Sequence, residues 1–261
     1  MSDRLVKLFE SGRPMVNGWL ALPCGFSAEI MACQGWDTLT IDLQHGLIDY
    51  GAATQMLSAI ATTDTVPLVR APWLDPGAIM KLLDAGALGV ICPMINTAAE
   101  AEALVAACRY PPRGNRSNGP IRAAYAYGAD YQASANERIM PIAMIETRSG
   151  LDNLQAILDV DGLAGVYIGP TDLGLALGAE PCFDPVDPRV TQAIETILSA
   201  ARSRGKLAGI HCGSTAYARE MIAKGFRLVT IGSDARFIAA GAQTILSDMR
   251  DAQAPSEGGG Y

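Results

Sequence analysis

The sequence predicts an α/β protein of the (β/α)8 class, a TIM barrel made by a single domain. Short apolar runs recur at intervals of roughly 20 to 40 residues, and most are followed by stretches with helical spacing. Runs this apolar fit parallel strands buried on both faces, and eight βα units close most naturally into a barrel. The eight candidate strands are residues 18–22, 38–43, 67–70, 89–93, 141–146, 165–169, 207–211 and 228–232. Helical spacing is clearest over residues 98–109, 150–160, 188–204 and 215–224.

A doubly wound open sheet is the competing architecture. Its best support would be a GxGxxG motif after the first strand, and none is present. A length of 261 residues suits one large domain, and no repeat or linker divides the chain. We therefore expect a barrel domain over residues 1–253 and a disordered tail over residues 254–261, which are poor in apolar side chains.

The composition indicates which cellular compartment and which classes of partner are expected. The net charge is −7, and the 16 arginines and four lysines are scattered, so nucleic acid and anionic membranes are poor partners and a small molecule is favoured. The six cysteines form no CxxC pair, which is typical of a reduced, cytoplasmic protein. No stretch approaches the roughly 18 apolar residues that a membrane span needs.

One connection, residues 110–140, is unusually long and contains Tyr125, Tyr127 and Tyr131. Long connections in compact domains are often lids or binding loops. The tyrosines indicate packing against another surface. A covering flap and a substrate-gating loop both remain open.

Polar residues gather where the predicted strands end. A charged group at the end of an apolar strand must be paired, hydrogen-bonded or bound to a metal. An ion pair such as Arg70 with Glu146 would satisfy that rule without chemistry, but five such residues on one rim favour a functional site. The polar and neighbouring residues at strand ends are Asp42, Gln44, His45, Arg70, Pro93, Met94, Glu146, Asp172, His211 and Cys212.

Glu146 and Asp172 stand about one strand-plus-helix unit apart, so neighbouring strands would bring both carboxylates to the same rim. Two carboxylates without nearby His or Cys ligands favour a hard cation such as Mg²⁺ or Mn²⁺. Such a site is completed by waters and substrate oxygens. A 2-oxo acid can chelate the cation, which then acidifies the adjacent C–H and makes an enolate accessible.

The remaining rim residues receive candidate roles. Arg70 could stabilise the developing oxyanion or serve only as an ion-pair partner, and the segment Gly169, Pro170, Thr171 and Asp172 could offer the N–H groups of Thr171 and Asp172 to a substrate carboxylate. His45 is a candidate acid or base, with its imidazole oriented by the Asp42 carboxylate. His211 is a weaker candidate for a substrate contact.

Other chemistries lack their signatures. The lysines are Lys7, Lys81, Lys206 and Lys224, none at a predicted strand end, so a Schiff-base mechanism is disfavoured. No Walker loop, nicotinamide fingerprint or GxSxG motif is present.

Six segments together resemble a known family. The sequence resembles the class II pyruvate aldolases of the 4-hydroxy-2-oxoheptane-1,7-dioate aldolase type, whose relatives include 2-dehydro-3-deoxyglucarate aldolase and macrophomate synthase. The resemblance covers nearly the whole chain in the expected order. The segments that carry it are TIDLQHG (40–46), PLVR (67–70), LLDAGA (82–87), RYPPRG (109–114), IETR (145–148) and YIGPTDL (167–173).

The resemblance implies a barrel of the phosphoenolpyruvate/pyruvate type that assembles as a hexamer, often with an exchanged C-terminal helix. It implies Mg²⁺, Mn²⁺ or Co²⁺ on Glu146 and Asp172, Arg70 beside the ketone oxygen, and His45 with Asp42 as the proton-transfer dyad. Asp84 would reach a neighbouring subunit's site, although the residues alone suggest only a carboxylate on a helix surface.

Two positions depart from that pattern. Members often have Glu before the histidine and Gln two residues before the metal-binding glutamate, where this chain has Gln44 and Met144. The first removes a charge near the base and the second a polar contact near the substrate. Both bear on acceptor preference and metal affinity.

The expected reaction is reversible aldol cleavage of a 4-hydroxy-2-oxo acid to pyruvate, or hydroxypyruvate, and an aldehyde, through a metal-stabilised enolate. The aldehyde is expected against the outer loops, including residues 113–131 and Asp84 of a neighbour. Two alternatives are a decarboxylase of the oxaloacetate type at the same site and a non-catalytic protein that binds 2-oxo acids.

Overall fold

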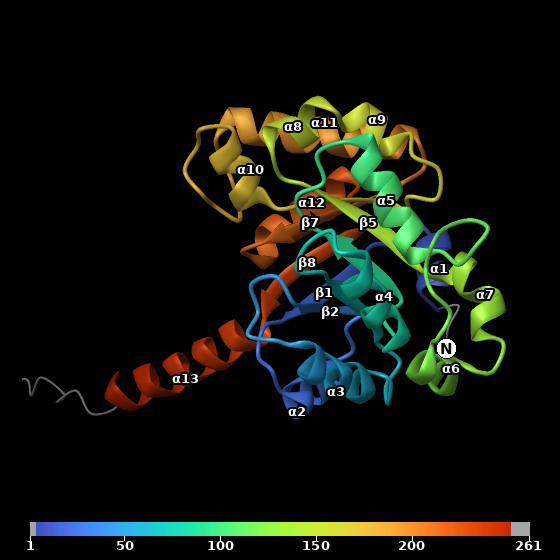
Figure 1. Cartoon of the computed structure of the whole chain (residues 1–261). Helices are drawn as coiled ribbons and strands as arrows, with labels where there is room; N and C mark the ends of the chain where they lie inside the picture. The colour runs from blue at the N-terminus through green and yellow to red at the C-terminus, as the bar shows by residue number, and fades with distance from the viewer. Residues whose placement is uncertain (1–3, 252–261) are drawn as a thin grey trace, which may run out of the picture.

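The computed structural model describes residues 4–251 and contains a closed barrel of eight parallel strands in chain order (Figure 1). The predicted fold class is confirmed, and each predicted strand is present with ends shifted by at most three residues. The strands are β1 (Met15–Leu20), β2 (Thr38–Asp42), β3 (Val66–Arg70), β4 (Gly89–Cys92), β5 (Met140–Ile145), β6 (Gly165–Ile168), β7 (Leu207–Cys212) and β8 (Leu228–Ser233).

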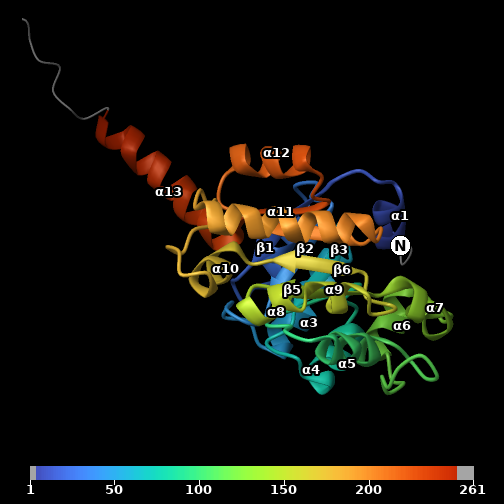
Figure 2. The same cartoon turned by 90° about the horizontal axis from the view of Figure 1, so that it is seen from above.

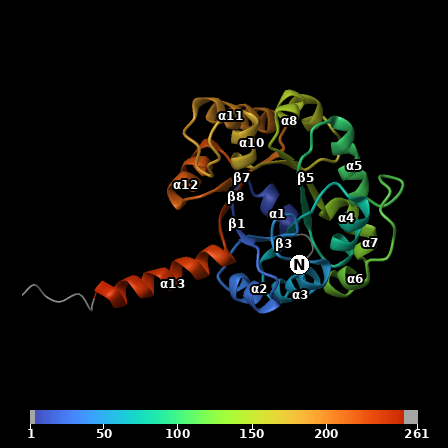
Figure 3. The ribbon, with the colours of Figure 1, turned by 60° about the vertical axis from the view of Figure 1, so that its left-hand side comes forward.

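Helices surround the barrel, with α2 (Gly25–Ala32) and α3 (Tyr50–Ile60) on one side and α10 to α12, within residues 170–224, on another (Figure 3). Several begin at a side-chain cap: Thr97 and Glu100 form a capping box at α5, and Asp75 accepts main-chain N–H groups at the start of α4. The helices are α1 (Arg4–Glu10), α2 (Gly25–Ala32), α3 (Tyr50–Ile60), α4 (Pro76–Asp84), α5 (Ala98–Cys108), α6 (Ile121–Tyr127), α7 (Tyr131–Arg138), α8 (Arg148–Asp152), α9 (Leu154–Leu158), α10 (Pro170–Ala176), α11 (Pro188–Ser203), α12 (Thr215–Lys224) and α13 (Asp234–Asp251).

The helix expected over residues 150–160 is instead two short helices, α8 and α9, that meet at Asn153. This residue leaves the helical conformation, with φ −95° and ψ 9°. Its side-chain amide donates to the main-chain oxygen of Asn96 at 2.9 Å, so it competes with the helical pattern.

The interior of the barrel is mostly aliphatic but contains a buried polar chain. Asn17 donates to the Thr230 hydroxyl at 2.8 Å and accepts from Thr38 and Thr40, while the Tyr167 hydroxyl also bonds Thr230. Each of these buried polar groups therefore has a partner, as a low-dielectric interior requires. The chain links β1, β2, β6 and β8 beneath the rim formed by the carboxyl ends of the strands.

The connection between α5 and β5 folds into α6 and α7 and packs at the opposite end of the barrel (Figure 1). Tyr127 donates to the main-chain oxygen of Gly86, and Arg122 donates to those of Ala85 and Leu57. These oxygens lie at the carboxyl ends of α3 and α4, from which the chain enters the next strands. Tyr110 and Tyr131 form a second small core there. Within one chain the segment is a covering flap that lies away from the cavity, and its expected contact with the aldehyde stays a prediction.

The last described helix, α13, leaves the barrel and projects away from it (Figures 1 and 2). Ile238, Ile245, Leu246 and Met249 are each more than half exposed along it. No helix in residues 4–251 combines the length and apolarity needed to cross a bilayer. The predicted tail, residues 254–261, lies outside the described residues.

Candidate active site

A cavity of about 400 Å³ opens at the carboxyl ends of the strands. That end of a barrel is where βα loops from separate strands can combine their side chains. It brings together the predicted residues Asp42, His45, Arg70, the segment 169–172 and His211, while Glu146 lies directly beside it. Met144, singled out in the sequence as a departure near the substrate, lines it as well. Residues that sequence reasoning did not assign to the site also line it: Trp19, Ala21, Tyr167, Phe183, Ser233 and Arg236.

Arg70 and Asp42 form a bidentate pair across β2 and β3, where they are register neighbours. The Arg70 Nε and Nη2 atoms lie 2.8 and 2.6 Å from the two Asp42 oxygens. Burial acts to raise the pKa of Asp42, but the hydrogen bonds and charge of Arg70 outweigh it and lower that pKa. The partner of Arg70 is therefore Asp42 and not Glu146, and Nη1 is not used by the pair.

His45 lies at the mouth of the cavity and is exposed. Its main-chain N–H, with that of Gln44, points to Asp42 Oδ1 at 3.3 and 3.0 Å. The expected contact between the Asp42 carboxylate and the His45 imidazole is not formed, because Arg70 and these amides occupy the carboxylate. Asp42 thus shapes the turn that carries His45.

Glu146 follows β5 and is only 2% exposed. Its Oε1 accepts the main-chain N–H of Met94 at 2.8 Å, and Met94 adopts a left-handed φ of 58°, which is unusual for a residue other than glycine. Burial, partly opposed by that hydrogen bond and reinforced by the charge of Asp172, raises the pKa of Glu146 to about 7. A buried carboxylate without a cationic partner suits a group that binds a cation.

Gly169 leaves room beside this carboxylate. A Cβ at that position would stand 2.6 Å from Glu146 Oε2, so any other residue would crowd the acid. Asp172 follows in the first turn of α10 and lines the same cavity. Among residues 4–251 no three His, Cys, Asp or Glu side chains form a metal cluster. The protein donors here are two oxygen acids, a set that fits a hard cation completed by water and substrate.

Asp84 lies far from the cavity of its own chain. It ends α4 at the amino-terminal side of the barrel and binds Arg116 Nη2 at 2.6 Å. Lysines are absent from the cavity lining, which agrees with the exclusion of amine catalysis.

Comparisons with known proteins identify the class. Residues 18–241 match the family model described as HpcH/HpaI aldolase/citrate lyase. The chain belongs to this family and is an enzyme of the aldolase type, a carbon–carbon lyase.

Individual relatives agree with this assignment. A hydroxypyruvate/pyruvate aldolase of Rhizorhabdus wittichii is 46% identical and covers 93% of this chain and 96% of its own. A 4-hydroxy-2-oxo-heptane-1,7-dioate aldolase of Salmonella dublin is 38% identical over 94% of both chains. A solved structure of a family member from Burkholderia cenocepacia has a TM-score of 0.89 at 30% identity and covers 96% of this chain and 100% of its own.

Proposed function

We propose that this cavity catalyses the reversible aldol cleavage of 4-hydroxy-2-oxo acids to an aldehyde and pyruvate or hydroxypyruvate. The observation that carries the proposal is the buried Glu146 carboxylate, which lies beside Gly169 at the wall of a cavity lined by Arg70 and Asp172. Aldolase names on relatives that cover nearly the whole chain support the same reaction.

Glu146 and Asp172 would hold a divalent cation such as Mg²⁺, Mn²⁺ or Co²⁺. When bound, this cation would polarise the ketone of the 2-oxo acid and make the adjacent carbon more acidic. The space that Gly169 leaves beside Glu146 Oε2 supports this assignment, because it keeps the carboxylate reachable from the cavity.

The protein groups around that position divide the remaining work. Arg70, held by Asp42, would direct Nη1 to the oxygen on which negative charge develops, and the N–H groups of Thr171 and Asp172 would bind the substrate carboxylate. His45 would take the proton of the C4 hydroxyl during cleavage, directly or through water. The C3–C4 bond then breaks, the aldehyde leaves, and protonation of the enolate releases the 2-oxo acid.

The decisive experiment follows the methyl protons of pyruvate in D₂O by NMR, with metal-stripped protein and with added Mg²⁺ or Mn²⁺. Exchange that requires the cation and disappears in Glu146→Ala would support the enolate site. His45→Ala should lose cleavage of a 4-hydroxy-2-oxo acid. Absence of exchange under every metal, with both pyruvate and hydroxypyruvate, would refute the proposal and favour a non-catalytic binding protein. Faster decarboxylation of oxaloacetate than aldol cleavage, judged by kcat/KM, would favour the decarboxylase.

We also propose a hexamer in which Asp84 enters the site of a neighbouring subunit and α13 packs on another chain. The exposed apolar residues of α13 support an intermolecular contact. A mixture of Asp84→Ala and Glu146→Ala chains tests this, because shared sites would regain activity that neither variant has alone. Light scattering of the wild type would measure the assembly, and a monomer would contradict it.

A further inference from the structure

His211 is the centre of an aromatic wall that has no role in the aldol mechanism proposed above. It lies near the end of β7, and its ring meets the edge of Trp19 with centroids 5.2 Å apart at an angle of 76°. On another side it stacks on Phe183 at 4.9 Å and 30°. Two aromatic contacts of different geometry fix both the position and the tilt of the imidazole.

No group among the described residues hydrogen-bonds the polar atoms of this ring. Within residues 4–251 neither ring nitrogen of His211 takes part in a hydrogen bond, although the residue is partly buried and lines the cavity. A polar group that is held by packing at a cavity wall and makes no hydrogen bond within the protein is placed to meet a ligand.

The imidazole is neutral at physiological pH. Burial, together with the charges of Arg70 and Arg236, lowers the pKa of His211 to about 4, and the carboxylates of Asp42 and Asp184 only partly oppose this. A neutral imidazole offers one N–H donor and one acceptor nitrogen. It therefore matches a hydroxyl group, which can both accept and donate, better than it matches a carboxylate.

We propose that His211 is a specificity-determining residue that hydrogen-bonds a hydroxyl group on C3 of the 2-oxo acid donor. The site would then use a 3-hydroxy-2-oxo acid, of which hydroxypyruvate is the simplest, in preference to pyruvate. This inference rests on the proposed aldolase function, since it assumes that the donor binds beside Arg70.

The location of His211 favours the donor over the aldehyde. The same Trp19 ring that meets His211 also lies under the Arg70 guanidinium, 5.0 Å from its centroid. Arg70 is the group that we place at the donor oxygen, and C3 is the carbon next to the carbon that carries this oxygen. Phe183, by contrast, is 38% exposed and carries Arg236 on its ring at 5.2 Å, so that part of the wall lies nearer to solvent.

The test compares His211→Phe with wild type. Phenylalanine keeps a flat ring between Trp19 and Phe183 but removes both polar atoms. For condensation with one fixed aldehyde, we expect the ratio of kcat/KM for hydroxypyruvate over pyruvate to fall about tenfold, the usual effect of leaving one hydroxyl unpaired. His211→Asn, which keeps a donor and an acceptor, should retain part of the preference. Cys182→Ser, beside Phe183 but outside the lining, should keep the wild-type ratio.

Each alternative outcome is informative. A ratio unchanged within twofold in His211→Phe, with the variant folded, would overturn the proposal. A changed preference between glycolaldehyde and acetaldehyde with an unchanged donor ratio would also overturn it and move His211 to the aldehyde. Exchange of the C3 protons of pyruvate and of hydroxypyruvate in D₂O by the wild type is measured in parallel. If both fail, the proposed function is at fault, and if either succeeds, an unchanged ratio refutes only the role of His211.

Discussion

Two buried Arg–Asp pairs stand at opposite ends of the barrel. Arg70 binds Asp42 at the carboxyl ends of the strands, and Arg116 binds Asp84 at the amino-terminal side. Both shortest N–O distances are 2.6 Å. Both guanidinium groups also lie over aromatic rings, Trp19 in the first case and Tyr110 in the second. Apart from the second hydrogen bond that makes the Arg70 pair bidentate, the contacts of the two pairs are alike.

They differ in what faces the guanidinium. The Arg116 side chain is fully buried, and its Nη atoms face Asp84 and the Tyr131 hydroxyl. Arg70 is 12% exposed and lines a cavity, and its Nη1 is not needed by Asp42. A closed pair joins the flap to the barrel, whereas a pair with an unused donor facing a cavity can act on a ligand.

The largest effect is expected on stability at the closed pair. Arg116→Met leaves Asp84 without its cation and removes one of the contacts between the flap and α4. We expect a loss of about 3 to 5 kcal/mol in unfolding free energy. Urea denaturation measures it. The double variant Arg116→Met with Asp84→Leu should recover part of the loss, because no unpaired charge remains. A single-variant loss under about 1 kcal/mol would show that the pair is not a structural contact.

The open pair should show its effect in kinetics. Arg70→Lys keeps the charge but loses the planar guanidinium, which binds Asp42 through Nε and Nη2 while Nη1 stays free of that pair. We expect kcat for aldol cleavage to fall about 10² to 10³-fold, as when a preorganised oxyanion donor is removed. A rise in KM with unchanged kcat would contradict this role, since it would show only uniform substrate binding.

The contrast also marks what the sequence could predict. The strands and their order follow from apolar periodicity, which depends on neighbours along the chain. The position of residues such as Glu146 and Asp172 at the rim follows in turn, because the carboxyl ends of all the strands of a parallel barrel lie at the same end. Ion-pair partners are harder to predict. The sequence leaves Glu146 as one option for the partner of Arg70, yet β2 and β3 are adjacent and their register places Asp42 opposite Arg70.

Other parts of the site depend on distant packing. Trp19 lies in β1 and Arg236 follows β8, the two strands that pair to close the barrel, and Phe183 lies in an irregular connection. No local sequence pattern indicates that these three residues share a cavity. The sequence predicts the flap only as one long connection, because α6 and α7 are too short for a strong periodic signal. The proline and tyrosine content of the flap does not indicate which end of the barrel it covers. Only its place in the chain, between α5 and β5, shows that it lies away from the site of its own chain.

Glu146 provides a third carboxylate to compare, since it is buried without a cation in the protein. Its pKa is raised to about 7, above the ordinary value near 4.5, so the folded metal-free protein holds a proton that the unfolded chain releases. Stability from this group is therefore full below about pH 4.5 and is lost as pH rises through 7, by about 3 kcal/mol in all.

Denaturation of metal-free protein between pH 5 and 8 measures this loss. Glu146→Gln, which stays neutral, should flatten the decline, and Mg²⁺ or Mn²⁺ should oppose it by binding the ionised form. If the wild type and Glu146→Gln decline in parallel, Glu146 is not the titrating group.

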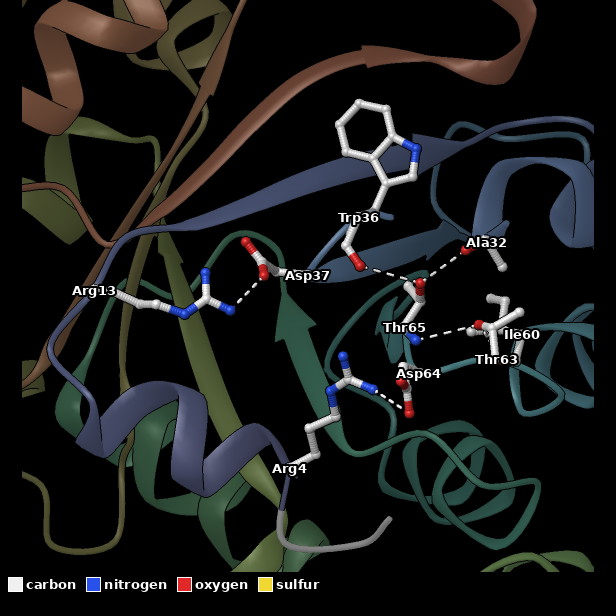
Figure 4. A network of polar contacts seen from close by, with 9 residues as sticks. All are labelled: Arg4, Arg13, Ala32, Trp36, Asp37, Ile60, Thr63, Asp64 and Thr65. Atoms are coloured by element: carbon white, nitrogen blue, oxygen red, sulfur yellow. Dashed lines mark hydrogen bonds and ion pairs between the residues drawn. The ribbon is translucent and has the colours of Figure 1, made fainter. Parts of the chain in front are cut away.

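The smallest effect is expected at an Arg–Asp pair that shares the chemistry of the other two but not their burial. Arg4 lies 2.7 Å from Asp64 at the amino-terminal end of the barrel, where Asp64 is 88% exposed (Figure 4). Water and salt screen this pair, and both side chains lose freedom to form it, so the double-mutant coupling energy should be about 0.2 to 1 kcal/mol. The measurement is a cycle of Arg4→Met, Asp64→Ala and the double variant in urea, repeated at high salt, where the coupling should vanish. A coupling as large as that of Arg116 with Asp84 would mean that burial does not explain the difference among the three pairs, and the distinction between closed, open and exposed arginines would fail.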